Sequence, residues 1–510
     1  MKRKCKASFL IAAILGLAWA GAAAAGSGFP GGVNEALGPG FSAAAHNSLR
    51  PRNHPDNAVT RWNEIALNAT GLDHTPVAPG EHRVFGEQFG PTRASRAMAI
   101  IHIAMFDAVN AIAGRYRGYT NIGRATADTS LDAAVAQAAH DTLAALYPSQ
   151  KASFDESLAE DLGHIDDHNR HAKANGIELG SRAAAAILAL RSGDGSQRPE
   201  PHMGIDFIPS EQPGYWRQDP IGKGPIALGA YWGEVKPFVM EASNQFRAPP
   251  PPPMVSPEYT AAYNEVKALG GDGFTTATVR TQEQTEIGTY WAYDGTPSLC
   301  APPRLYNQIT LHIADQMGTS SDVPQLARLL ALVNVSMADA AIAVWESKYY
   351  YQFWRPVTGI RESDQGTGPT GKGDGNPDTV GDPTFTPLGA PASNLMGPNF
   401  TPPFPAYPSG HGGFGGALFE TLRKFYGTDR IAFTFVSDEF NGVTRDNTGH
   451  LRPLLPRSFR SLSQAEDENG QSRIYLGIHW RFDKTQAIAQ GRKVADYVFE
   501  NALTPLQREK

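Results

Sequence analysis

Two basic side chains, Lys348 and Arg355, define the first of three segments in this sequence that could bind an anion. They lie seven residues apart, which is two turns of an α-helix, so the spacing predicts that both project from one helix face. Pro356 follows directly and is expected to end that helix. Alone, the pattern is more typical of a solvated basic edge beside a stripe of buried tyrosines.

The second segment enters a glycine-rich helix through Pro408, Ser409, Gly410 and His411. A serine at the entry and glycine in the first turn leave backbone N–H groups that can bind an oxyanion. The imidazole of His411 at this position could give or take a proton. In isolation, ordinary helix capping would account for the same residues.

The third segment contains Ser472, Arg473, His479 and Asp483. His479 and Asp483 are four residues apart, so on a helix the carboxylate can reach one imidazole nitrogen and direct the other towards a ligand. Arg473 adds a third cation to those of the first segment. Taken alone, His479 would be interpreted as a core histidine whose hydrogen bonds are satisfied.

Together the three segments carry eleven fixed positions. At roughly one in 20 for each, they would coincide by chance with a probability on the order of 10⁻¹⁴ per placement. The combined pattern, K-x6-RP, PSGH and SR-x5-H-x3-D, resembles the signature of the superfamily that unites vanadium haloperoxidases with type 2 phosphatidic acid phosphatases. Residues 353–356 and 404–411, with Trp345 three residues before Lys348, are most similar to the vanadium chloroperoxidase branch.

The resemblance implies a site for vanadate, which phosphate could also occupy. His479 would be the axial nitrogen ligand of vanadium, oriented by Asp483, and His411 would be the acid–base residue. The equatorial oxygens of vanadate are then assigned to five groups, namely Lys348, Arg355, Ser409, the Gly410 N–H and Arg473.

The same resemblance implies a reaction between hydrogen peroxide and a halide, with vanadium acting as a Lewis acid. Lys348 would polarise the peroxide, and the halide, chloride or bromide, would be oxidised to hypohalous acid, which can pass to an organic acceptor. Trp345 and Phe404 would line the halide pocket. Asp294 would pair with a site arginine.

Two other functions would use the same residues. A soluble exported acid phosphatase would employ His479 as a nucleophile, forming a phosphohistidine, and His411 to protonate the leaving group. A non-catalytic scaffold that binds oxyanions would keep the cations but would have no need of both histidines. Trp345 and Phe404 favour the haloperoxidase, which is the function we expect.

Apolar residues at three- and four-residue spacing dominate the elements that must position these groups, and period-two runs are scarce. We therefore expect a mainly α fold, made of helical bundles of the vanadium haloperoxidase and acid phosphatase type, with long Gly/Pro-rich loops. The loop 361–408 is too long to be passive and is expected to wrap the site. No role is assigned to 437–464. The expected helices cover 58–69, 93–112, 131–146, 150–162, 177–190, 257–269, 282–293, 304–317, 323–354, a stretch after 410, and 475–500.

The chain has 510 residues, of which 41% are hydrophobic, so it can bury a large core. Five prolines at 249–253 are expected to form a stiff spacer. We expect 26–253 to be an N-terminal helical region and 254–510 a C-terminal helical bundle that holds the site. The net charge of −6 offers no basic excess for nucleic acid, so binding to nucleic acid is not expected.

Residues 1–25 have the pattern of a secretory signal peptide, because basic residues precede an apolar run that ends in small residues. We expect the mature protein to be secreted or periplasmic, without stable insertion into a membrane. Signal cleavage would remove Cys5 and leave only Cys300. An intramolecular disulfide is therefore not expected.

Overall fold

The structure is a computed structural model that describes residues 28–43, 57–165 and 170–506. Within these ranges it is built mainly from α-helices, as predicted, with two antiparallel strand pairs. The predicted signal peptide lies outside the described residues. The α-helices are α1 (Val33–Ala36), α2 (Ala58–Asp73), α3 (Gly90–Ala113), α4 (Leu131–Leu146), α5 (Lys151–His164), α6 (Arg170–Arg191), α7 (Pro257–Leu269), α8 (Gln282–Tyr290), α9 (Pro302–Gln316), α10 (Val323–Tyr351), α11 (Pro356–Arg361), α12 (Gly410–Tyr426), α13 (Leu462–Tyr475) and α14 (Arg481–Asn501). The strands are β1 (Ser42–Ala43), β2 (Leu395–Met396), β3 (Phe433–Asn441) and β4 (Leu454–Phe459).

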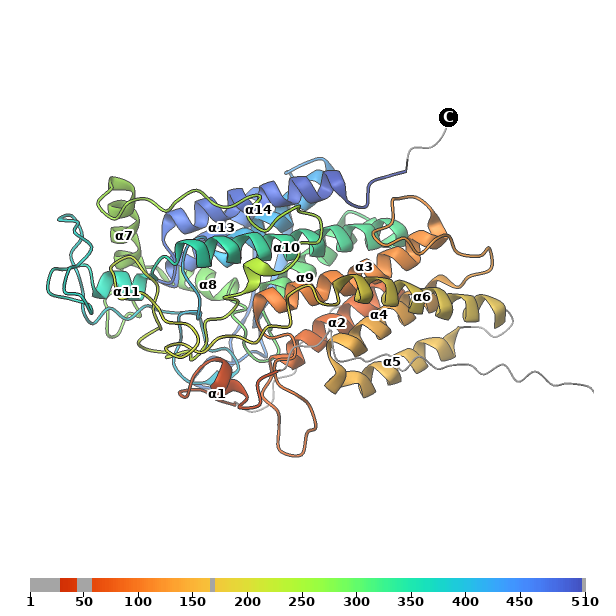
Figure 1. Cartoon of the computed structure of the whole chain (residues 1–510), viewed down its shortest axis with the longest axis horizontal. Coiled ribbons are helices and arrows are strands. Elements are labelled where there is room, and N and C mark those ends of the chain that lie inside the picture. The colour runs from red at the N-terminus through yellow and green to blue at the C-terminus, as the bar shows by residue number, and fades with distance from the viewer. Residues whose placement is uncertain (1–27, 44–56, 166–169, 507–510) are drawn as a thin grey trace, which may run out of the picture.

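Helix α10 runs through the middle of the fold (Figure 1). It begins after Asp322, whose carboxylate accepts a hydrogen bond from the Gln325 N–H, and it has proline in its first turn. It contacts α3 from the first half of the chain and α12 and α14 from the second. Because helices from both halves surround it, its side chains are buried along most of its length.

Two helices in the described part of the chain, Gly90–Ala113 and Val323–Tyr351, are long and apolar enough to cross a bilayer. Within their most apolar windows, however, 89% and 100% of the residues are buried inside the protein. A helix that is apolar on all sides is expected in the core of a large protein as well as in a membrane. The apolar surface of these helices is therefore used in packing.

Helices α12 and α14 cross so closely that only glycine fits at their contact. A Cβ atom at Gly491 would overlap the carbonyl oxygen of Gly413, and a Cβ atom at Gly416 would lie 2.6 Å from the carbonyl oxygen of Ile488. The glycine-rich start of α12 is thus a packing surface as well as a helix entry. This contact brings the first turn of α12 beside the first turn of α14.

Helix α10 ends at Tyr351, three residues before the predicted end, which corrects the expected position of Arg355. Gln352 adopts a left-handed conformation with φ of 48° and turns the chain. Pro356 then begins α11 and does not end α10, since proline is well tolerated in the first turn of a helix. Lys348 and Arg355 consequently do not share one helix face.

The segment 437–464 lies in the β3–β4 hairpin and the start of α13, which sequence patterns did not predict. Strand β3 pairs with β4 from Phe433 opposite Phe459 to Val436 opposite Pro456. Burial alternates only over the first residues of β3, because residues 437–441 are all buried and so lack the period-two signal. Helix α13 has few apolar residues, so it shows no helical periodicity either.

The two halves of the chain share one core. A single hydrophobic cluster contains residues of α3 and α4 together with residues of α10 and α12. The prolines at 249–253 lie in an extended and largely exposed stretch, and the division into 26–253 and 254–510 stays a prediction. Cys300 is buried and is a free thiol among the described residues.

Candidate active site

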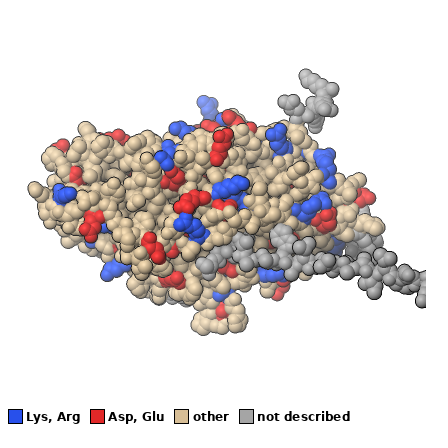
Figure 2. All heavy atoms as spheres, viewed as in Figure 1, with Lys and Arg blue, Asp and Glu red and all other residues tan. Residues whose placement is uncertain are grey.

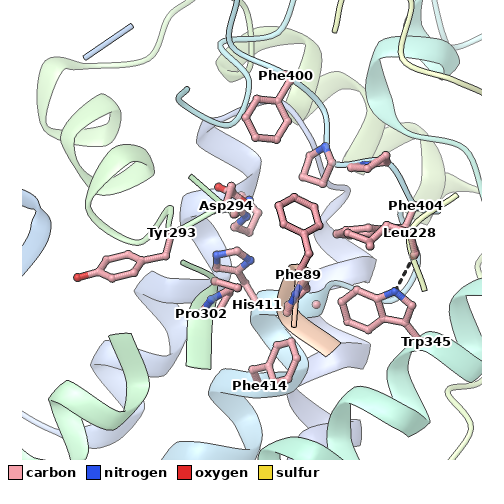
Figure 3. Close-up of a pocket in the computed structure, with 18 of the residues that line it drawn as sticks. Phe89, Leu228, Tyr293, Asp294, Pro302, Trp345, Phe400, Phe404, His411 and Phe414 are labelled. Atoms are coloured by element: carbon pink, nitrogen blue, oxygen red, sulfur yellow. Dashed lines mark hydrogen bonds and ion pairs between the residues drawn. The ribbon is translucent and has the colours of Figure 1, made fainter. Parts of the chain in front are cut away.

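The predicted site residues come from separate elements and meet around one cavity (Figure 3). Helix α10, the loop 362–409, the start of α12, the end of α13 and the residues before α14 all contribute. Seven of the predicted residues line the cavity, namely Asp294, Trp345, Phe404, Gly410, His411, Arg473 and His479. The other four, Lys348, Arg355, Ser409 and Asp483, lie directly behind this lining and are buried.

The loop after α11 wraps two of the buried cations, as predicted from its length. The Nζ of Lys348 donates to the carbonyl oxygens of Pro405 at 2.7 Å and Ala406 at 2.9 Å. The Nε of Arg355 donates to the carbonyl oxygen of Phe404 at 2.9 Å. Burial lowers the pKa of Lys348 well below its usual value, and neighbouring Arg355 lowers it further.

The third cation, Arg473, is held mainly by Asp294. Its Nη2 donates to Oδ1 of Asp294 at 2.6 Å, and both side chains are at least 96% buried. Within the described ranges, neither Nε nor Nη1 of Arg473 has a hydrogen-bond partner. Buried donors are normally satisfied. The N–H groups of these two nitrogens are therefore available to an anion in the cavity.

His479 is fixed by two partners that determine which nitrogen carries the proton. Its Nδ1 lies 2.8 Å from Oδ2 of Asp483, and its Nε2 lies 2.9 Å from Nη1 of Arg355. Because a carboxylate accepts and a guanidinium donates, the proton belongs on Nδ1 and Nε2 keeps its lone pair. Burial, and then Arg355, lower the pKa of His479 well below its usual value, so the ring is neutral.

The contact between His479 and Asp483 was predicted, but its local structure differs from the expected helix. His479 precedes α14, whereas Asp483 is in the first turn of α14 and also accepts from the Trp480 N–H at 3.1 Å. A helix cap, and not a helix face, thus brings the two side chains together. Burial raises the pKa of Asp483 to about 7.

His411 is in the first turn of α12, where its Nε2 lies 2.6 Å from the carbonyl oxygen of Ala292. A carbonyl only accepts, so Nε2 carries the proton and Nδ1 is the nitrogen that can take one up. Burial, followed by the charge of Arg473, lowers the pKa of His411 well below its usual value. Ser409 caps the helix, since its hydroxyl accepts from the Gly412 N–H at 3.4 Å.

The other side of the cavity is apolar. Figure 3 shows Phe404 and Trp345 across the cavity from His411 and Asp294. The rings of Trp345 and Phe404 are 4.9 Å apart, and the Nζ of Lys348 is 5.1 Å from the centre of the Phe404 ring. Cationic donors and an apolar wall therefore face the same small space.

Much of the apolar lining was missed in the sequence. The apolar lining residues that were missed belong to no short motif, and several come from the first half of the chain. The spacing of residues within the three signature segments therefore could not reveal them. A clustering of aromatic residues and prolines at 400–404 was the one local signal. The additional lining residues include Leu37, Phe89, Pro91, Leu228, Pro302, Phe400, Pro402, Pro403 and Phe414.

The arrangement suits a tetrahedral oxyanion. Three buried basic side chains and the N-terminus of α12 lie in or directly behind the lining of one cavity, and charge-assisted hydrogen bonds are among the strongest that a protein forms. A free cation would be repelled by the same groups. The lone pair on Nε2 of His479 accepts from Arg355 here, and it is the lone pair that can bind the central atom of such an anion.

Comparison with known proteins identifies related sequences. Residues 328–508 match the family model described as the VCPO second helical-bundle domain. Over 517 aligned positions, the chain is 31% identical to the vanadium chloroperoxidase of Curvularia inaequalis. That alignment covers 86% of this chain and 80% of the relative.

Solved structures share the fold. A bacterial vanadium-dependent iodoperoxidase superposes with a TM-score of 0.68 at 23% identity, covering 91% of this chain and all of the other. A bacterial vanadium-dependent chloroperoxidase in its apo form gives 0.60 at 17% identity, covering 81% of this chain and 94% of the other. These similarities extend across both halves of the chain, beyond the three signature segments.

Binding of a simple oxyanion should be coupled to proton uptake by Lys348. The pKa of this amine is depressed in the free protein, and a nearby anion raises it, so at a pH between these two pKa values the complex should bind more protons than the free protein. Titration calorimetry with orthophosphate in buffers of different ionisation enthalpy measures this uptake. Lys348→Met should reduce it, whereas Lys424→Met, at an amine paired with Asp496, should not. Equal uptake in both variants would contradict the assignment.

Proposed function

The chain belongs to the vanadium haloperoxidase family, and we propose that it uses vanadate to oxidise a halide with hydrogen peroxide, releasing hypohalous acid. The observation that carries the proposal is the burial of three basic side chains close to His479, whose unprotonated Nε2 accepts a hydrogen bond from one of them, Arg355. Hydrogen peroxide and a halide, chloride or bromide, are the proposed substrates. An organic acceptor of the hypohalous acid is a further proposed partner.

The residues present fit vanadate as a cofactor. We assign the vanadium-binding nitrogen to Nε2 of His479, with Asp483 holding the ring through Nδ1. When bound, vanadate supplies a Lewis-acidic centre that activates hydrogen peroxide for attack by a halide. The proposed oxygen-binding groups are the side chains of Lys348, Arg355, Ser409 and Arg473 and the N–H of Gly410.

His411 is the proposed acid–base residue. Its Nε2–H is engaged by Ala292, which leaves Nδ1 to accept and return the protons of hydrogen peroxide. A depressed pKa keeps this nitrogen free of a proton at neutral pH. Trp345 and Phe404 exclude water from the same space, which strengthens the electrostatic interactions of the cations there.

Reconstitution tests the function directly. Purified protein is stripped of bound anions, reloaded with orthovanadate, and assayed with hydrogen peroxide plus bromide or chloride. The anion-free protein is assayed separately with an aryl phosphate. We expect halide oxidation that depends on vanadate. Phosphate-ester hydrolysis without halide oxidation would show instead that the site is that of a phosphatase.

The two histidines should respond differently to substitution. His479→Ala should abolish tight orthovanadate binding and halide oxidation, because it removes the only protein ligand expected for vanadium. His411→Ala should still bind orthovanadate but lose roughly 10²–10⁴-fold in turnover, the usual scale for a general acid–base group. His450→Ala, at a histidine whose side chain is 83% exposed, serves as the control and should change neither. Similar loss of orthovanadate binding in both site variants would refute the assigned roles.

Phe404 should determine how well chloride is oxidised. Its ring lies 4.9 Å from that of Trp345 and 5.0 Å from the Arg355 guanidinium, so it shields the cations from water. Phe404→His should lower the chloride rate more than the bromide rate, because imidazole adds a titratable polar group to the pocket. Phe404→Leu keeps the wall apolar and should preserve the ratio of the two rates. Steady-state rates at matched orthovanadate loading test this, and equal losses for both halides in Phe404→His would make Phe404 a packing residue only.

We also propose that the protein is exported and that its mature chain begins near Gly26. The support is the sequence of residues 1–25, with its basic start, apolar run and small residues at the end. N-terminal sequencing of protein recovered from the periplasm or medium should find the new terminus. Recovery of the chain with Met1 intact in a membrane fraction would count against export.

A further inference from the structure

The β3–β4 hairpin contacts Tyr290, the last residue of α8, and the start of the segment that links α8 to α9, which carries Asp294. The Tyr290 hydroxyl donates to the carbonyl oxygen of Phe435 at 2.9 Å, and the Ser437 hydroxyl donates to the carbonyl oxygen of Tyr290 at 2.6 Å. The ring of Tyr290 also contacts that of Phe459 in β4. The hairpin is therefore attached to one short stretch of chain next to the cavity.

Two side chains of the proposed active site, His411 and Arg473, donate hydrogen bonds to that stretch. The Ala292 carbonyl accepts from His411 at 2.6 Å, and the Asp294 carboxylate accepts from Arg473 at 2.6 Å. Between them, Tyr293 adopts a left-handed conformation with φ of 46°. A residue other than glycine rarely adopts this conformation and persists in it only where its surroundings hold it.

Glu439 of β3 supplies that support. Its Oε1 accepts a hydrogen bond from the Tyr293 N–H at 3.1 Å. Its Oε2 accepts from the Ser393 hydroxyl at 2.6 Å and pairs with the Arg452 guanidinium. The Glu439 carboxylate is completely buried, so the arginine compensates a charge that would otherwise be costly there.

The Tyr293 side chain is held by the same strand. Its hydroxyl accepts from the Asp438 N–H at 2.7 Å and lies 3.2 Å from Oε1 of Gln308, to which it donates. Both the backbone N–H and the hydroxyl of Tyr293 are thus engaged, although Tyr293 itself forms part of the cavity lining. Glu439 is not among the lining residues, so it can act on the site only through its neighbours.

We propose that Glu439, fixed by Arg452 and Ser393, is a positioning residue of the active site. By holding the Tyr293 N–H it keeps the turn in its left-handed form, which directs the Asp294 carboxylate to Arg473 and the Ala292 carbonyl to His411. This role rests on the proposed function of the site. It also gives the segment 437–464 a function that its sequence did not reveal.

Two double variants isolate the hydrogen bond from the ion pair. Glu439→Gln with Arg452→Met removes both charges but keeps an amide oxygen for the Tyr293 N–H and an amide N–H for the Ser393 hydroxyl. Glu439→Ala with Arg452→Met removes the same charges and the hydrogen bond. Binding of orthovanadate and of orthophosphate is measured for both, together with the midpoint of thermal unfolding.

The glutamine variant should bind both anions within about 3-fold of the wild type, and the alanine variant should bind them roughly 5- to 100-fold more weakly, the range expected for loss of a buried hydrogen bond. Glu466→Ala is the matched control. This glutamate is 1% exposed and pairs with Arg423 and Arg492. It should lower the unfolding midpoint and leave anion affinity unchanged.

A second comparison asks whether Glu439 acts through Arg473. In the background of Asp294→Ala, the Glu439→Ala change should weaken anion binding no further, since the contact it positions is already lost. Independent, additive losses would overturn the proposal, as would equal anion affinity in the glutamine and alanine variants. Because orthophosphate binding is measured without peroxide or halide, these outcomes are separate from failure of the wild type to oxidise halides.

Discussion

Mutual repulsion among three buried cations is the constraint on which the rest of the site depends. Lys348, Arg355 and Arg473 are each at most 1% exposed, and burying charges without compensation is costly. The protein offsets this cost with carbonyl oxygens from the loop 402–406 and with two carboxylates, Asp294 and Asp483. The compensation is incomplete, because two nitrogens of Arg473, Nε and Nη1, have no hydrogen-bond partner within the described structure. An anion would supply the missing partner. Binding of an oxyanion would therefore relieve the unfavourable electrostatic energy of the buried basic groups.

The sequence predicted the reacting groups better than the backbone that presents them. The type and spacing of residues such as His479 and Asp483 were enough to predict their contact. The contact is present, although it is made at a helix cap and not on one helix face. The end of α10 was misplaced because a left-handed Gln352 leaves no signature in a helical pattern. Short-range periodicity reports the secondary structure that each segment favours locally. The position of this turn depends instead on packing between segments that are distant in the sequence.

The same reason explains why the hairpin and the apolar wall were not foreseen. Strand β3 is buried on both faces where it meets the site, and Glu439 has no spacing relation to Tyr293, from which it is 146 residues distant. Phe89 and Leu228 reach the cavity from the first half of the chain. Figure 2 shows acidic and basic side chains interspersed over the visible surface. The concentrated positive charge of this acidic protein is internal, where composition gives no hint of it.

The glycine contact between α12 and α14 has a consequence for how the protein loses activity. His411 is in the first turn of α12 and His479 lies two residues before the start of α14, so their separation depends on a crossing at which Gly416 and Gly491 leave no room for a side chain. Parting of the two helices would separate the imidazoles, and it would also expose the core that the helices share with α10. The relative position of the two histidines therefore depends on the same cooperative unfolding unit as the helical bundle. Heat or denaturant should spare its geometry until the whole bundle fails.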